Sequence, residues 1–149
     1  MVGVLMLQIE TRWQDLTVEY LCSIISDSQR LVEIVEGIFG SVTATESQQE
    51  LTEDLISELI QLSVLANRYL CELRFLDLKD TFFNFIGGPE WSNGELPVED
   101  TIAELRDFLA DVKGWIQGDF YHGKVLKLCF DIFLQSYIAS FLSNTIVKG

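Results

Sequence analysis

The stretch FYHGKVLKLCFDIFLQSYIASFL, residues 120–142, decides the fold. On a helix with about 100° per residue, its apolar side chains occupy nearly the whole circumference. The narrow polar stripe that remains consists of Lys124, Lys127, Asp131 and Gln135. Such a helix is not stable alone in water, which leaves three interpretations: a central core helix, a helix that docks a partner, and a membrane span. The core interpretation is favoured, and charged side chains at hydrocarbon depth disfavour the span.

Composition and charge indicate one acidic, helical domain. The chain has 149 residues, 48% of them apolar, and only two prolines, which is enough for one domain with a sizeable core. Its formal net charge of −13 repels nucleic-acid phosphates and anionic lipid surfaces. Residues 120–149 hold only 1 of the 23 acidic side chains. We therefore expect a single domain over 1–149, no nucleic-acid partner and one apolar, faintly basic end.

Hydrophobic periodicity predicts four long helices, at about 13–39, 47–86, 98–116 and 120–142. Ser47 and Glu50 have the spacing of a capping box at the end of the predicted connection 41–50, and Gly87 to Pro89 end the second helix. That helix carries a seam of residues at steps of four and three: Leu55, Leu59, Leu62, Ala66, Tyr69, Leu73 and Leu76. Such a seam is typical of long helices packed nearly parallel. The pattern predicts an all-α, elongated up-down bundle of about four long helices.

Motifs for catalysis, cofactor binding or metal binding do not occur in this sequence. His122 is the only histidine and has no neighbouring nucleophile or second histidine, so no catalytic role is expected. Cys22, Cys71 and Cys129 are far apart in the sequence and each lies in an apolar helical context. This predicts reduced, buried thiols in the cytoplasm and not a metal site. We expect no enzyme activity, no cofactor and no metal.

The N-terminal run MVGVLMLQIE is apolar but short. It contains no basic residue of the kind that begins a signal peptide, and no small-residue cleavage site precedes Glu10. We therefore expect no signal peptide, and the charged residues within 120–142 lead us to expect no transmembrane segment.

Two blocks of sequence resemble the Sec-six family, the exocyst subunit also called exocyst complex component three. The first block is WQDLTVEYLCSIISDSQRLVEIVEGI, in which Tyr20, Ile24, Asp27 and Arg30 match an aromatic, apolar and polar helix signature. The second block runs from residue 83 to residue 142. Its matching residues are Val98, Glu99, Asp100, Asp107, Phe108 and Tyr137. The resemblance spans about residues 13–142 and is a pattern of helical faces, without a catalytic motif.

The resemblance implies a fragment of a helical-rod tethering subunit that helps to bring secretory vesicles to the plasma membrane. It implies a cytoplasmic protein, peripheral at the plasma membrane, with other exocyst subunits and SNARE proteins as partners. Because members of the family continue with further helices, the apolar end of the last helix is the expected interaction surface and a candidate homo-oligomer contact. Its residues are Phe133, Tyr137, Ile138, Phe141 and Leu142. The alternative is a stand-alone helical bundle that carries an apolar ligand in a Phe-rich interior.

Overall fold

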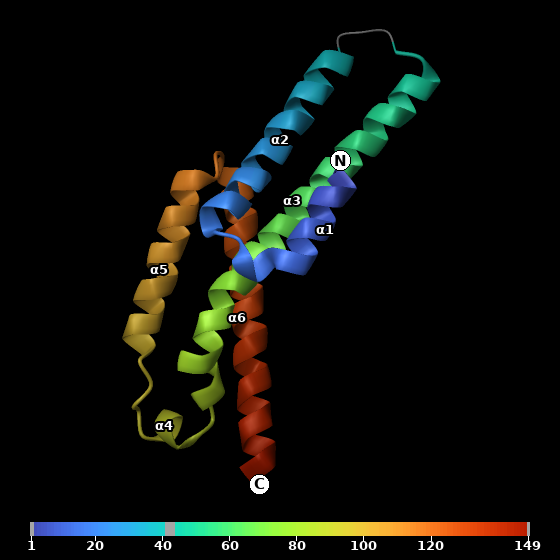
Figure 1. Cartoon of the computed structure of the whole chain (residues 1–149). Helices are drawn as coiled ribbons and strands as arrows, with labels where there is room; N and C mark the ends of the chain where they lie inside the picture. The colour runs from blue at the N-terminus through green and yellow to red at the C-terminus, as the bar shows by residue number, and fades with distance from the viewer. Residues whose placement is uncertain (1, 41–43, 149) are drawn as a thin grey trace. The chain divides into compact units, whose positions relative to one another are not determined.

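The chain is all-α in the computed structural model, which describes residues 2–40 and 44–148 and contains no strand in that part of the chain. Two single-turn 3₁₀ helices, η1 (Trp13–Asp15) and η2 (Phe83–Phe85), lie between the α-helices (Figure 1). The α-helices are α1 (Val2–Arg12), α2 (Val18–Gly40), α3 (Glu46–Thr81), α4 (Pro89–Ser92), α5 (Val98–Trp115) and α6 (Asp119–Lys148). The predicted fold class is therefore confirmed, although the number of helices differs from four.

The helices divide into two compact units. The first unit comprises residues 1–70 and 115–117, and the second comprises residues 71–114 and 118–149. The division falls within α3, which contributes its first part to one unit and its last part to the other. A single domain over the whole chain stays a prediction.

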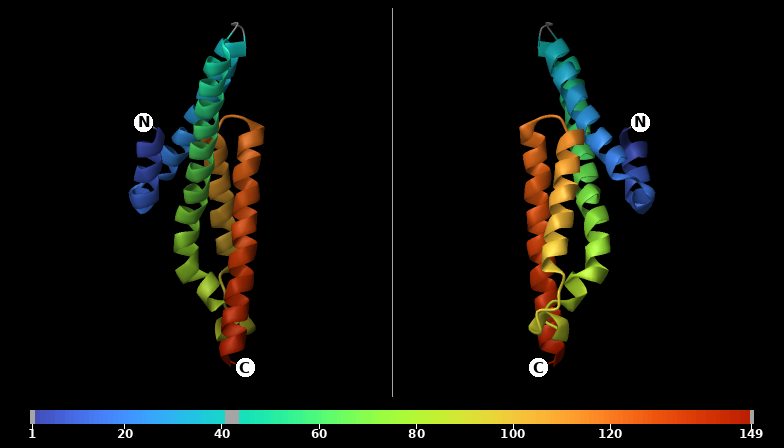
Figure 2. Two further views of the ribbon diagram at one scale, coloured as in Figure 1. Left: turned by 90° about the vertical axis from the view of Figure 1, so that its right-hand side faces the viewer. Right: turned by 90° about the vertical axis from the view of Figure 1, so that its left-hand side faces the viewer.

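The first unit is built around α2 and the first part of α3, which lie side by side and run in opposite directions (Figures 1 and 2). Apolar side chains from both helices are fully or almost fully buried: Leu21, Cys22 and Ile25 from α2, and Leu59, Leu62 and Ala66 from α3. Helix α1 adds the buried Ile9. Trp13 stacks on Tyr69 with ring centroids 5.4 Å apart, which fixes η1 against α3.

Capping side chains determine the residues at which α2 and α3 begin. The backbone N–H of Tyr20 donates to Thr17 Oγ1 at 3.1 Å, so α2 begins at Val18 and not at the predicted Trp13. At the start of α3 the capping box joins Thr45 and Gln48, with the Gln48 N–H donating to Thr45 Oγ1 and the Thr45 N–H to Gln48 Oε1. The predicted box at Ser47 is therefore wrong by two residues. Residues 41–43 of the predicted connection lie outside the described part of the chain.

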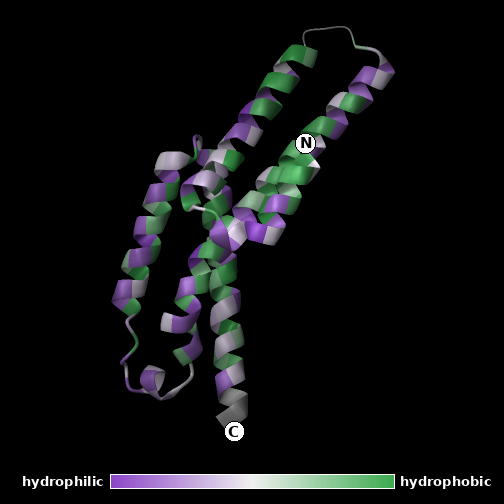
Figure 3. Cartoon of the chain, in the orientation of Figure 1, coloured by the Kyte–Doolittle hydropathy of each residue, from purple (hydrophilic) through white to green (hydrophobic). Residues whose placement is uncertain are grey.

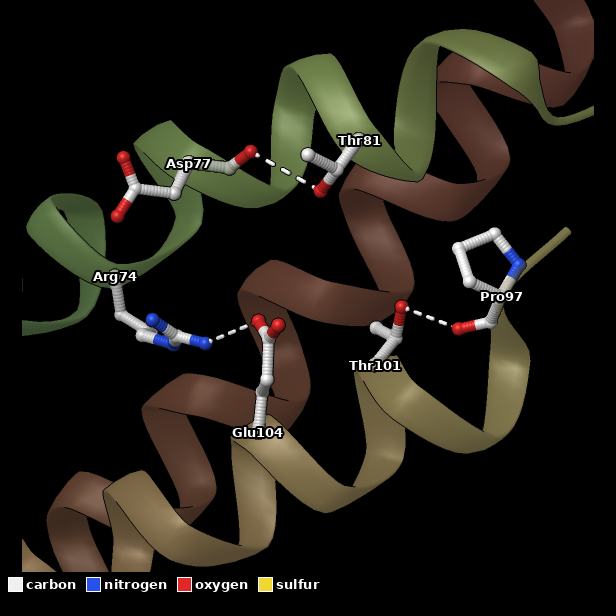
Figure 4. A network of polar contacts seen from close by, with 6 residues as sticks. All are labelled: Arg74, Asp77, Thr81, Pro97, Thr101 and Glu104. Atoms are coloured by element: carbon white, nitrogen blue, oxygen red, sulfur yellow. Dashed lines mark hydrogen bonds and ion pairs between the residues drawn. The ribbon is translucent and has the colours of Figure 1, made fainter.

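The second unit consists of the end of α3, the turns around α4, and helices α5 and α6. Arg74 on α3 forms an ion pair of 2.6 Å with Glu104 on α5 (Figure 4). At the start of α5, the buried hydroxyl of Thr101 donates to the Pro97 carbonyl at 2.8 Å, which satisfies one polar group in the first turn. The prediction of a helix at 98–116 is confirmed to within one residue.

Helix α3 ends at Thr81, five residues before the predicted end at Ile86. Phe82 and Phe83 are both buried and meet edge to face at 5.4 Å. The chain leaves the helix at Phe82 (φ −133°, ψ −62°) and forms η2.

The predicted seam along α3 and the predicted core position of α6 need correction. Leu59, Leu62 and Ala66 of the seam are buried, but Leu55 and Leu76 are exposed, and Phe75 and Leu78 are buried in place of Leu76. The buried face of α3 therefore changes where the helix passes from one unit to the other. Helix α6 is not the central core helix, since among its described side chains only Val125 and Cys129 are buried.

Candidate interaction surface

An apolar groove lies between α5 and α6 in the second unit and has a volume of about 420 Å³. Its walls come from one face of α5 and one face of α6, with a single aromatic ring from α3 at its base. The lining residues are Phe75, Ile102, Leu105, Arg106, Leu109, Cys129, Phe130 and Phe133. The groove is open to solvent, because Ile102 and Phe130 are 58% and 64% exposed.

The two walls run in opposite directions along neighbouring helices (Figures 1 and 2). On α5 the lining residues have the i, i+3, i+4, i+7 spacing of one helix face, so this wall is about 10 Å long at ~1.5 Å per residue. Arg106 is the only charged residue of the lining, and its guanidinium lies 3.7 Å from the Asp107 carboxylate. Acidic side chains at Asp107 and Asp111 are exposed elsewhere on α5 and do not line the groove.

A row of exposed apolar side chains continues from the groove along α6. Its members, four residues apart, follow the i±4 ridge of the helix over about 18 Å. The row consists of Phe130, Leu134, Ile138 and Leu142, which are between 48% and 64% exposed. Apolar residues recur along α6 from its start toward its end (Figure 3). Soluble proteins rarely leave so continuous an apolar surface uncovered, which makes the groove and this row a candidate interaction surface.

The five residues predicted as an interaction surface occupy different environments on α6. Ile138 and Leu142 are exposed members of the row, and Tyr137 is half-buried. Phe141 is half-buried and meets the Trp91 ring edge to face at 5.7 Å. Phe133 is half-buried and contacts three rings, at 5.2 Å (Phe83), 6.1 Å (Phe82) and 6.3 Å (Phe75). These contacts place Phe133 at the base of the groove, between the surface and the aromatic core.

Sequence reasoning missed the α5 wall and the pairing of two cysteines. Cys71 and Cys129, 58 positions apart, have their sulfur atoms 3.2 Å from each other. Residues distant in the sequence meet here because α3 and α6 pack together, and no local spacing could have indicated it. The Nε2 atom of His122 lies 3.3 Å from the Leu109 carbonyl oxygen, so this ring links α6 to α5.

Helix α6 also has a length and composition that would suffice to cross a membrane. The span 119–144 has a mean hydropathy of 1.5, and only about a tenth of it is buried. Core helices of soluble proteins meet the same criterion of length and composition. The span contains Lys127 and Asp131, whose side chains form an ion pair of 3.7 Å.

The architecture is that of an all-α protein whose candidate site is a helical packing surface. Among the described residues, no group of three or more His, Cys, Asp or Glu side chains is placed to hold a metal ion. The family model described as Exocyst complex component Sec6 matches residues 6–149. The chain belongs to this family.

The family defines the general role of the chain. The exocyst tethers vesicles for exocytosis, and its Sec6 component is a non-catalytic subunit whose partners include other subunits of the complex. No characterised protein and no solved structure matched the chain.

Proposed function

We propose that the chain acts in vesicle tethering by binding an amphipathic helix of another exocyst subunit along the groove between α5 and α6 and the apolar row of α6. The continuous exposure of Phe130, Leu134, Ile138 and Leu142 carries this proposal. Family membership supports an exocyst subunit as the partner. Ile138 and Leu142 of the predicted surface contact the partner directly, and Phe133, Tyr137 and Phe141 hold the row in position.

The shape and chemistry of the surface favour a helix as the occupant. The groove is open, it is bounded by two helices, and its length matches about two helical turns. An amphipathic helix buries its apolar face in such a groove through residues at i, i+3, i+4 and i+7. A carrier for an apolar ligand would instead enclose most of the ligand surface.

The net charge of the chain favours a partner of opposite charge. The chain as a whole carries a net charge of −13. A partner helix with Lys or Arg along the edge of its apolar face would be attracted during the encounter. A second copy of the same acidic chain would be repelled at long range.

Co-purification with purified exocyst subunits tests the proposal through two matched substitutions. Leu134 on α6 is 58% exposed and lies on the row, whereas Leu31 on α2 is 48% exposed and lies in the first unit. We expect Leu134→Asp to weaken binding at least tenfold, because a charge would be buried at the interface. Leu31→Asp should leave binding unchanged, and circular dichroism should show both variants folded.

Several outcomes would contradict the proposal. If both variants bind like the wild type, or if only Leu31→Asp loses binding, the surface does not lie on α6. Flotation with neutral lipid vesicles and sedimentation of the chain alone test the two other occupants, a membrane and a second copy. If the chain binds vesicles or forms a stable dimer, and Leu134→Asp abolishes this, the surface is occupied by a membrane or a second copy and not by an exocyst subunit. SNARE proteins, and a peripheral position at the plasma membrane, stay predictions, and purified SNARE proteins can be examined in the same assay.

A further inference from the structure

Two buried cysteines in the second unit form a close pair. Cys71 on α3 and Cys129 on α6 have their sulfur atoms 3.2 Å apart, and neither forms a disulfide bond. A disulfide bond is about 2.04 Å long, so the sulfurs would have to approach by about 1.2 Å for a bond to form. The Cys71 sulfur also lies 4.0 Å from the carbonyl oxygen of the buried Val125, which holds it on the side of α6.

The two thiols differ in their access to solvent. Cys129 lines the open apolar groove between α5 and α6, but Cys71 does not line it and is fully buried. A small neutral molecule that enters the groove therefore meets Cys129 first. Cys71 lies behind it, within reach of any group that forms on the Cys129 sulfur.

The local interactions also distinguish Cys129 from the third cysteine. A hydrogen bond with Cys71 lowers the pKa of Cys129, although burial opposes this effect. Burial raises the pKa of Cys22, in the first unit, to about 12. Thiolates and not thiols react with oxidants, so these shifts favour Cys129 over Cys22 as the site of oxidation.

We propose that Cys129 and Cys71 form a peroxide-sensitive dithiol site, in which Cys129 is oxidised first and Cys71 resolves the product into a disulfide. The Cys129 thiolate attacks one oxygen of hydrogen peroxide, an S–O bond forms, and the O–O bond breaks. The released hydroxide takes up a proton and leaves as water. The product is a sulfenic acid at Cys129.

In the second step the Cys71 sulfur attacks the sulfenic sulfur. The S–S bond forms, the S–O bond breaks, and the hydroxyl leaves as water with the proton of Cys71. Overall, two thiols and one peroxide give one disulfide and two waters, and two electrons pass from sulfur to peroxide oxygen. The disulfide joins α3 to α6 next to the groove, so oxidation ties together the two helices that meet at the base of the interaction surface.

Peptide mapping of the full-length chain after treatment with hydrogen peroxide tests this site. Digestion without reductant should give one cross-linked peptide pair, containing Cys71 and Cys129 and lighter by two hydrogen atoms. Cys22 should remain a free thiol that is alkylated only after denaturation. Dimedone added together with peroxide should label Cys129 and not Cys71, which identifies the order of the two steps in the wild-type chain.

Alanine variants separate the roles of the cysteines. Cys71→Ala should accumulate the sulfenic acid at Cys129, Cys129→Ala should leave Cys71 reduced, and Cys22→Ala should behave like the wild type. Circular dichroism checks that each variant is folded. The proposal is overturned if the disulfide joins two chains, includes Cys22, or does not form at peroxide concentrations that oxidise glutathione. If Cys71→Ala fails to fold, the order of dimedone labelling in the wild type decides the question alone.

Discussion

Replacing Phe133 with alanine tests whether α6 is anchored by the aromatic cluster at the base of the groove. The Phe133 ring contacts Phe75, Phe82 and Phe83 at centroid distances of 5.2 to 6.3 Å. The three neighbouring rings are buried, so the cavity left by the substitution cannot be filled by water without exposing them. We therefore expect Phe133→Ala to destabilise the second unit.

The magnitude follows from burial and ring contacts. Truncation of a buried Phe to Ala costs 3–5 kcal/mol, and Phe133 is half-buried, which places the expected loss at about 3 kcal/mol. Phe130 supplies a matched control on the same helix, because it is 64% exposed. Phe130→Ala changes helix propensity by the same amount but removes little buried surface, so its expected effect is about 0.5 kcal/mol or less.

Denaturation with urea, followed by circular dichroism, measures both variants under identical conditions. The midpoint for Phe133→Ala should shift to lower urea, while the midpoint for Phe130→Ala should remain close to that of the wild type. Equal shifts for the two variants would refute the assignment of Phe133 to the aromatic core and of Phe130 to the surface. A larger effect at Phe130 would mean that the groove closes over that ring in solution.

Two further predictions concern backbone strain and alkaline pH. Gly87 has φ +80°, and a Cβ there would lie 3.3 Å from the Asn144 Cβ. Gly87→Ala should therefore lower the free energy of unfolding by about 1–2 kcal/mol, as measured by urea denaturation. Gly123 is helical and has open space around it, so Gly123→Ala should raise the free energy of unfolding. The pKa of Cys22 is raised from 9.0 to about 12 by burial, so the stability that its neutral thiol confers is complete below pH 9 and is lost as pH rises toward 12. The stability of the wild type relative to Cys22→Ala should therefore fall by about 3 kcal/mol between pH 8 and pH 11; a difference independent of pH would contradict this.

The sequence predicted the parts of the fold that local periodicity determines. The helix over Val98–Trp115 was located to within one residue, because a proline and two acidic residues mark its start and a clear apolar face continues to its end. The start of α6 was located equally well. The first helix was placed five residues too early, since the apolar pattern continues through Trp13 although the cap lies at Thr17.

Tertiary contacts determine three features of the structure that the local sequence pattern did not predict. Helix α3 ends just before two adjacent phenylalanines, Phe82 and Phe83, that are both buried, and periodicity alone assigned them to a continuing helix. The change of the buried face along α3, from Ala66 to Phe75, depends on different neighbours on either side of residue 70. The α5 wall of the groove could not be predicted either, because Ile102 and Leu105 follow the same pattern as the buried Phe108 and Val112.

The composition of α6 explains why one helix contributes both to the core and to the candidate surface. A helix that packs on one side of a small unit needs a single apolar stripe, and Val125, Cys129 and Phe133 supply it on α6. The exposed row that begins at Phe130 lies outside this stripe, and its side chains are about half exposed or more, so packing within the unit does not require them to be apolar. Since the charged side chains of α6 lie beside the row and do not interrupt it, a partner that covers the row accounts for its composition, whereas packing within the second unit does not.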